Sequence, residues 1–116
     1  MFKDCYHLTT PPSTLPAITL AQGCYAFMFQ NCYVLSTAPA LPATTLANGC
    51  YANMFDHTAL TDAPDLPATT LATNCYAEMI EDCTSLTAAP TLPATTLAIQ
   101  CYAYMFRCCT SLTDAP

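Results

Sequence analysis

The phrase Leu-Pro-Ala-Thr-Thr-Leu begins three times, at Leu41, Leu66 and Leu92, and a close relative, Leu-Pro-Ala-Ile-Thr-Leu, begins at Leu15. Successive copies therefore start 26, 25 and 26 residues apart. This period is typical of repeat proteins, in which each unit is too small to bury its apolar face alone and buries it against neighbouring units. The sequence therefore predicts one stacked array rather than a domain with a single central core.

The array over residues 1–116 contains about 4.5 repeats of 25–26 residues. Its divisions are a partial repeat, 1–14, and four full repeats, 15–40, 41–65, 66–91 and 92–116. The chain starts and stops inside a repeat, and neither end carries the atypical capping unit that repeat arrays need for solubility. We therefore expect a fragment of a longer array or filament.

The constant residues of each repeat recur with helical spacing. In the last repeat Leu97, Cys101 and Met105 are four residues apart, as are Tyr102 and Phe106, so the segment predicts an amphipathic helix. Ser/Thr turn chemistry and a short apolar alternation follow, which predict a strand of roughly two to four residues. These strands are centred near Leu35, Leu60, Leu86 and Leu112. The expected fold is an α/β solenoid of the leucine-rich-repeat kind, with one short strand and one helix in each repeat.

The segments MFKDCYHLT, MFQNCYVLS, MIEDCTSLT and MFRCCTSLT recur in register with this period. They resemble the BspA-like leucine-rich repeats of bacterial and protist cell-surface proteins. The resemblance implies an extracellular or surface-displayed, non-enzymatic protein that adheres to a host or neighbouring cell. The proline-rich LPATTL and Ala-Pro segments depart from the family pattern.

Charge and composition limit the classes of partner that the chain is expected to bind. The chain carries two basic and eight acidic residues, a net charge of -6, which argues against binding to nucleic acid, whose phosphates attract Lys and Arg. No run of about 20 apolar residues is present, so membrane insertion is not expected. The expected partner is a surface protein or glycan of the host or a neighbouring cell, without a cofactor.

Specificity in such an array is expected at the variable positions. Phe27, Asn53, Glu78 and Tyr104 occupy the same variable position of successive repeats, so they are the predicted binding column. A structural role is the alternative: an array without caps can associate through its ends, and contacts that do not close produce an extracellular filament.

The nine cysteines are the remaining candidates for chemistry. Eight of them recur at two positions of the repeat. They are expected either to be small buried side chains that stack in a ladder or to pair in disulfides. Cys108 falls at a position that is polar in other repeats, so it is the predicted exposed thiol.

No Cys-x-x-C pair occurs, and His7 and His57 lie at unrelated positions without regular acidic partners, so neither a metal site nor a catalytic site is expected. The acidic residues from Asp56 to Asp82 are expected to form a solvated face rather than a calcium site.

Overall fold

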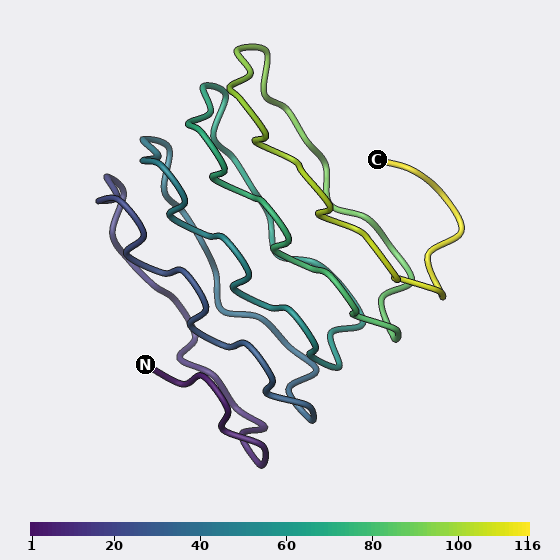
Figure 1. The fold of residues 1–116 in the computed structure, drawn as a ribbon. Helices are drawn as coiled ribbons and strands as arrows, with labels where there is room; N and C mark the ends of the chain where they lie inside the picture. Colours follow the sequence, from purple (N-terminus) through teal and green to yellow (C-terminus); the bar gives the residue numbers. More distant parts are fainter.

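The computed structural model describes residues 1–116 as a stack of flattened coils, with the N-terminus in purple at one end and the C-terminus in yellow at the other (Figure 1). Its principal extents are 34 × 30 × 19 Å. Backbone hydrogen bonds join residues about one repeat apart, such as the N–H of Leu15 to the carbonyl of Ala40 at 3.0 Å and the N–H of Leu71 to that of Thr96 at 3.0 Å. Equivalent residues of successive coils therefore lie next to one another.

The predicted α/β solenoid is wrong, because the structure contains no helix and no continuous strand. Regular pairing is limited to isolated parallel bridges, which join Thr14 to Ala40, Thr19 to Thr45, Asp62 to Ala88 and Thr70 to Thr96. The leucine-rich-repeat architecture, which depends on a strand in every unit, is therefore absent. Leu35, Leu60 and Leu86, predicted at strand centres, are instead fully buried side chains of the core. Since the structure has no helix, none is long and apolar enough to cross a membrane.

A run of overlapping turns replaces each predicted helix. In the first full coil the N–H of Cys24 donates to the carbonyl of Ala21, and the N–H of Met28 donates to that of Tyr25, both at 3.2 Å. The third residue of each turn has a left-handed backbone, with φ of 61° at Gly23 and 60° at Phe27. A positive φ at the third residue is the mark of a type II turn. The same arrangement recurs every four residues in the following coils.

The remaining N–H groups of these turns bond to the next coil. Tyr25, Phe27 and Phe29 donate to carbonyl oxygens one repeat further along the chain, each at 2.9 Å. Backbone donors therefore alternate between a partner within the coil and a partner in the next coil. This alternation satisfies the polar groups of a buried backbone without a helix or a sheet.

The four-residue spacing explains why the helix prediction failed. An α-helix has 3.6 residues per turn, so side chains spaced by four drift around its axis by about 40° at each step. Turns that repeat every four residues do not drift, and they return Cys50 and Met54 to the same buried side. Every fourth residue of that coil, Gly49, Asn53 and His57, takes a positive φ. Gly and Asn are the residues that adopt this conformation most readily.

The core consists of columns in which like side chains stack from coil to coil. The rings of Phe29 and Phe55 lie 5.5 Å apart between centroids and nearly parallel, and those of Tyr51 and Tyr76 lie 5.8 Å apart. Methionine, leucine and cysteine columns complete a single cluster of 25 buried residues. Leu97, predicted on the buried face, is 63% exposed.

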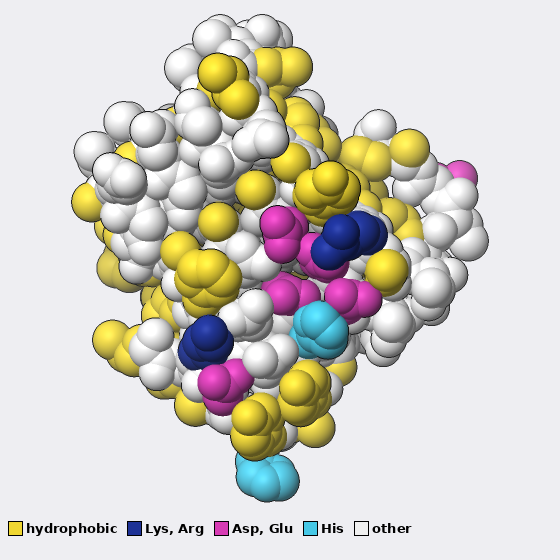
Figure 2. All heavy atoms as spheres, viewed as in Figure 1, with side chains coloured by type: hydrophobic (Ala, Val, Ile, Leu, Met, Phe, Trp, Pro, Cys, Tyr) yellow, Lys and Arg dark blue, Asp and Glu magenta, His cyan; other side chains and the backbone are white.

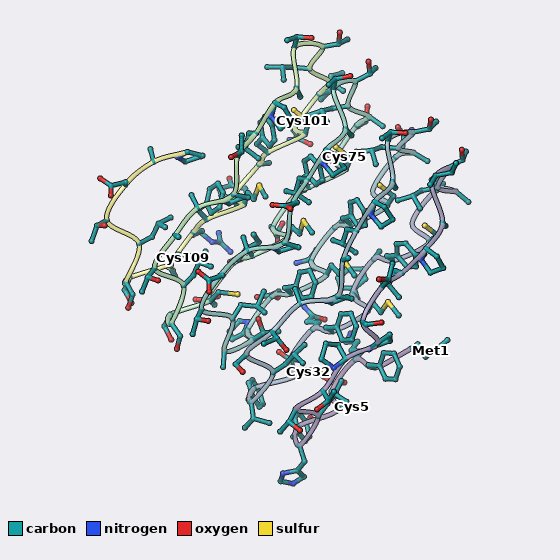
Figure 3. The ribbon with its side chains drawn as sticks, turned by 180° about the vertical axis from the view of Figure 1, so that it is seen from behind. Met1, Cys5, Cys32, Cys75, Cys101 and Cys109 are labelled. Carbon is teal, nitrogen blue, oxygen red and sulfur yellow. The ribbon has the colours of Figure 1, made fainter.

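All nine cysteines are free thiols, and six of them are buried. Figure 3 shows Cys5, Cys32 and Cys109 following the stack along one line, with Cys75 and Cys101 along another. In the first line the buried thiols also bond to the backbone: Cys32 donates to the carbonyl of Phe2 at 3.1 Å. The structure therefore corresponds to the buried ladder rather than to disulfides.

Candidate ligand-binding surface

One surface of the stack carries most of the charged side chains, which gather around a single histidine (Figure 2). It is formed by three adjacent columns with one residue from each coil, and we call it the polar ribbon. The outer column is Phe27, Asn53, Glu78 and Tyr104; the middle column is Lys3, Gln30, Asp56, Glu81 and Arg107; the third column is Asp4, Asn31, His57, Asp82 and Cys108. The polar ribbon holds both basic residues of the chain and five of its eight acidic residues.

The outer column is held in register by the backbone. The N–H of Asn53 donates to Ala77 at 3.0 Å, and the N–H of Glu78 donates to Ala103 at 2.8 Å. The side chains also meet, because the Asn53 amide donates to a carboxylate oxygen of Glu78 at 3.0 Å. Tyr104 is 61% exposed. The four residues predicted for binding therefore lie in one line along the stack.

A shallow depression of about 240 Å³ opens beside this line, and we call it the amide depression. Its polar lining consists of Asn53, Asn74, Glu78, Gln100 and Tyr104, with alanines between them. Three of the four predicted residues line it. The fourth, Phe27, lies outside it, and its ring contacts the ammonium group of Lys3, 5.3 Å from the ring centroid.

Sequence reasoning missed Asn74 and Gln100. Both have a positive φ and share a coil position with Gly23 and Gly49. The signal was available, because a position that alternates between glycine and an amide is typical of a left-handed turn residue. Such a residue belongs to the exposed corner of a turn, and therefore to the surface.

The amide depression offers hydrogen-bonding groups of both kinds around an aromatic ring. Amide side chains donate and accept hydrogen bonds, and the Glu78 carboxylate accepts them. The guanidinium carbon of Arg107 lies over the Tyr104 ring, 4.8 Å from its centroid. A cation over a tyrosine face is attracted by the π-electrons of the ring. These groups suit a ligand with several hydroxyl groups and an apolar face.

The middle column corrects the prediction of a solvated acidic face for two residues, since Asp56 and Glu81 are buried, at 6% and 4% exposure. Asp56 accepts a hydrogen bond from the Gln30 amide at 2.8 Å, and Glu81 pairs with Arg107 through one oxygen. The other oxygen of Glu81, Oε2, is buried without a hydrogen-bond partner. Burial raises the pKa of the Glu81 carboxyl, and the contact with Arg107 offsets this only in part.

The third column places His57 between two carboxylates. Its Nδ1 lies 2.6 Å from Oδ1 of Asp56, and its Nε2 lies 3.4 Å from Oδ2 of Asp82. The sequence shows no regular acidic partner for either histidine, whereas the structure places two carboxylates beside His57. Asp56 adjoins His57 in sequence, but Asp82 reaches it only because the coils stack. In a serine-hydrolase triad the distal nitrogen faces a hydroxyl, whereas here it faces a carboxylate.

Cys108 follows Asp82 in the third column, and its thiol is exposed. A side-chain hydrogen bond to Asp82, with the charge of that carboxylate, raises the pKa of the Cys108 thiol. A raised pKa keeps the thiol protonated and weakens it as a nucleophile at neutral pH. Cys24 is exposed as well, so Cys108 is one of two exposed thiols.

The largest depression lies elsewhere and offers little chemistry. It has a volume of about 630 Å³ and is lined mainly by the alanines and prolines of the Ala-Pro and Leu-Pro segments, including Pro39, Pro42 and Pro64. Its only polar side chains are those of Ser13 and Asp65. A ligand site normally combines an apolar wall with several convergent polar groups, so the amide depression is the better candidate.

Comparison with known proteins finds no matching family model, curated protein or solved structure. The resemblance to BspA-like surface proteins stays a prediction from the repeated segments.

Proposed function

We propose that this chain is a non-enzymatic binding protein, displayed at a cell surface, that recognises a glycan through the amide depression. The observation that carries the proposal is that Asn53, Asn74, Glu78 and Gln100 line one depression together with the exposed ring of Tyr104. Surface display rests on the resemblance of the repeated segments to surface proteins.

The chemistry of the lining favours a glycan over other ligands. Sugars present hydroxyl groups around an apolar ring face, and amide side chains can donate to and accept from the same hydroxyl network. An aromatic ring provides a rigid apolar surface at low entropic cost. The open shape favours a ligand that is bound from the solvent side rather than enclosed.

The stacking of the coils adds a directional preference. Hydrogen-bonded neighbouring chain segments lie about 4.8 Å apart. The side chains of the outer column therefore recur at this interval along the stack, as a row of contacts. A linear oligosaccharide lying along the row makes contacts with more than one coil, which raises its affinity over that of a single sugar.

The test is binding of the labelled chain to an array of oligosaccharides, with follow-up titration of the best ligand. Asn53→Gly and Tyr104→Gly remove the two side chains while keeping a residue that accepts the positive φ of these positions, 53° in each case. Each variant is expected to weaken binding by at least about tenfold, the equivalent of about 1.4 kcal/mol.

Ile18→Ala is the matched control, since Ile18 is 64% exposed and lies outside the polar ribbon. It should bind as the unmodified chain does. The proposal is refuted if no oligosaccharide binds, or if both ribbon variants bind with unchanged affinity while thermal melts confirm that they are folded.

A further inference from the structure

Asp56, His57 and Asp82 bring three metal-ligating groups together where successive coils meet. One ligand atom of each lies within 4.8 Å of the others. Asp56 and His57 come from one coil, and Asp82 occupies the position of His57 in the next coil. The shared position is shown by the backbone: the N–H of His57 donates to Glu81, just as the N–H of Asp82 donates to Arg107.

The imidazole of His57 is oriented as in protein metal sites. An ionised carboxylate only accepts hydrogen bonds, so Nδ1, 2.6 Å from Asp56 Oδ1, is the nitrogen that carries a proton, and Nε2, on the side of Asp82, is the nitrogen that can bind a metal ion. A carboxylate bonded to the second nitrogen of a histidine fixes the tautomer and makes the histidine a stronger ligand. The 3.4 Å between Nε2 and Asp82 Oδ2 also suits two ligands of one ion. Zinc bonds of 2.0–2.2 Å in a tetrahedron place their ligand atoms roughly 3.3–3.5 Å apart.

A buried carboxylate next to Asp82 in the chain adds to the negative charge near this group. Glu81, which precedes Asp82 in the chain and follows Asp56 in the middle column, is 4% exposed, and its Oε2 has no hydrogen-bond partner. The side chain of Glu78 lies beside that of Glu81, so the unpartnered oxygen belongs to a local cluster of carboxylates. Four carboxylates, those of Asp56, Glu78, Glu81 and Asp82, here share the nearby positive charge of Arg107. This part of the polar ribbon therefore carries excess negative charge.

The group is also accessible. The side chains of His57 and Asp82 are 48% and 28% exposed. They line a depression of about 330 Å³, together with Tyr33, Thr84 and Ser85 among others. An ion bound there retains water ligands on its open side, so it need not be enclosed during folding.

We propose that His57 and Asp82, supported by Asp56, bind a first-row divalent transition-metal ion such as Zn²⁺. Imidazole nitrogen is a preferred ligand of zinc, copper and nickel, whereas calcium and magnesium take oxygen ligands. The positive charge of the ion offsets the surplus of carboxylates in the polar ribbon. The ion also joins two successive coils, so it stabilises the stack as well as the site.

The test follows the two histidine side chains by nitrogen–proton NMR while ZnCl₂ is added to the whole chain. The background carries Cys24→Ser and Cys108→Ser, because these exposed thiols compete for zinc. The His57 ring signals are expected to shift in a saturable manner at one equivalent, and those of the exposed His7 are expected to stay in place. MgCl₂ at the same concentration should leave both unchanged.

Asp82→Asn is the informative variant, and Asp62→Asn, at an exposed carboxylate outside the polar ribbon, is its control. We expect Asp82→Asn to weaken the zinc affinity reported by His57 by at least about tenfold and Asp62→Asn to leave it unchanged. Three results overturn the proposal: His57 signals that do not respond to zinc, an equal response to magnesium, or equal zinc affinity in the two variants.

Discussion

The thiol of Cys83 donates a hydrogen bond to the carbonyl oxygen of Phe55 in the preceding coil, at 3.1 Å. The same bond joins Cys109 to Ile80 at 3.0 Å. No backbone N–H donates to the Phe55 carbonyl, so the thiol is what satisfies this buried acceptor. The cysteine column is therefore both an apolar filler of the core and a set of polar bonds between coils.

Cys83→Ala should consequently lower the free energy of unfolding by more than the small loss of side-chain volume alone would. The substitution leaves the Phe55 carbonyl buried without a donor, at a cost of about 1–3 kcal/mol. Urea denaturation at neutral pH under reducing conditions measures the change. Cys24→Ala, at an exposed thiol, is the control and should change the stability by less than about 0.5 kcal/mol. Equal effects of the two substitutions would contradict a bonding role for Cys83.

The buried thiols also predict a loss of stability in alkali. Burial raises the pKa of Cys50 to about 11 and that of Cys83 to about 11. An unfolded thiol has a pKa of about 8.5, so between this pH and 11 the unfolded chain releases protons that the folded chain retains. The unfolded state then binds fewer protons, and stability must fall as the pH rises.

The expected slope for each such thiol approaches about 1.4 kcal/mol per pH unit once the unfolded group is ionised. Urea denaturation at pH 7, 8, 8.5 and 9 in a reducing buffer measures it, below the pKa of about 10 of an ordinary tyrosine. Cys83→Ala should show a shallower decline above pH 8, because one of the contributing thiols is gone. A free energy of unfolding that does not change over this pH range would contradict the raised pKa values of the buried thiols.

Some features of the fold could be predicted from the sequence and others could not. The stacking follows from the period between Leu15, Leu41 and Leu66, because each unit must bury its apolar side against another. The secondary structure could not be obtained from apolar spacing alone, since residues at i, i+4 and i+8 fit both a helix and a series of turns. The signal that separates them is the glycine or amide at the first left-handed position of each full coil, namely Gly23, Gly49, Asn74 and Gln100.

The candidate sites were predictable to different extents. The outer column required only repeat alignment, because equivalent residues of stacked units become neighbours. The cluster around His57 required the stack itself: Asp82 is 25 residues away in sequence and reaches the imidazole only through the register of the coils. The burial of Glu81 was equally inaccessible, since charged residues at variable positions are exposed in most proteins.

The left-handed turn positions predict which substitutions the coils accept. Gly49 has a φ of +62°, and a Cβ there would meet nothing within 4 Å. Any cost of a side chain therefore comes from the backbone conformation and not from a clash. Gly49→Val should destabilise the chain by about 1–2 kcal/mol, whereas Gly49→Asn should cost less because asparagine visits this region readily. Urea denaturation of the two variants checks this, and equal stability of the Val and Asn variants would show that the turn does not depend on the left-handed residue.

Glu81 gives the prediction with the clearest dependence on acid. Because burial raises the pKa of its carboxyl in the folded chain, the folded state takes up the proton at a higher pH than the unfolded state, whose carboxyl has a pKa of about 4.3. The folded state then binds more protons than the unfolded state, so this group's contribution to stability grows as the pH falls toward about 4.3 and levels off below it.

Glu81→Gln imitates the protonated form at every pH. In the presence of EDTA the variant should therefore melt at a higher temperature than the unmodified chain at pH 7, and the difference should disappear near pH 4. Asp62→Asn, at an exposed carboxylate, should show no such convergence. If Glu81→Gln melts at a lower temperature at pH 7, the ion pair with Arg107 outweighs the cost of burying the carboxylate, and the unpaired oxygen is not a source of instability.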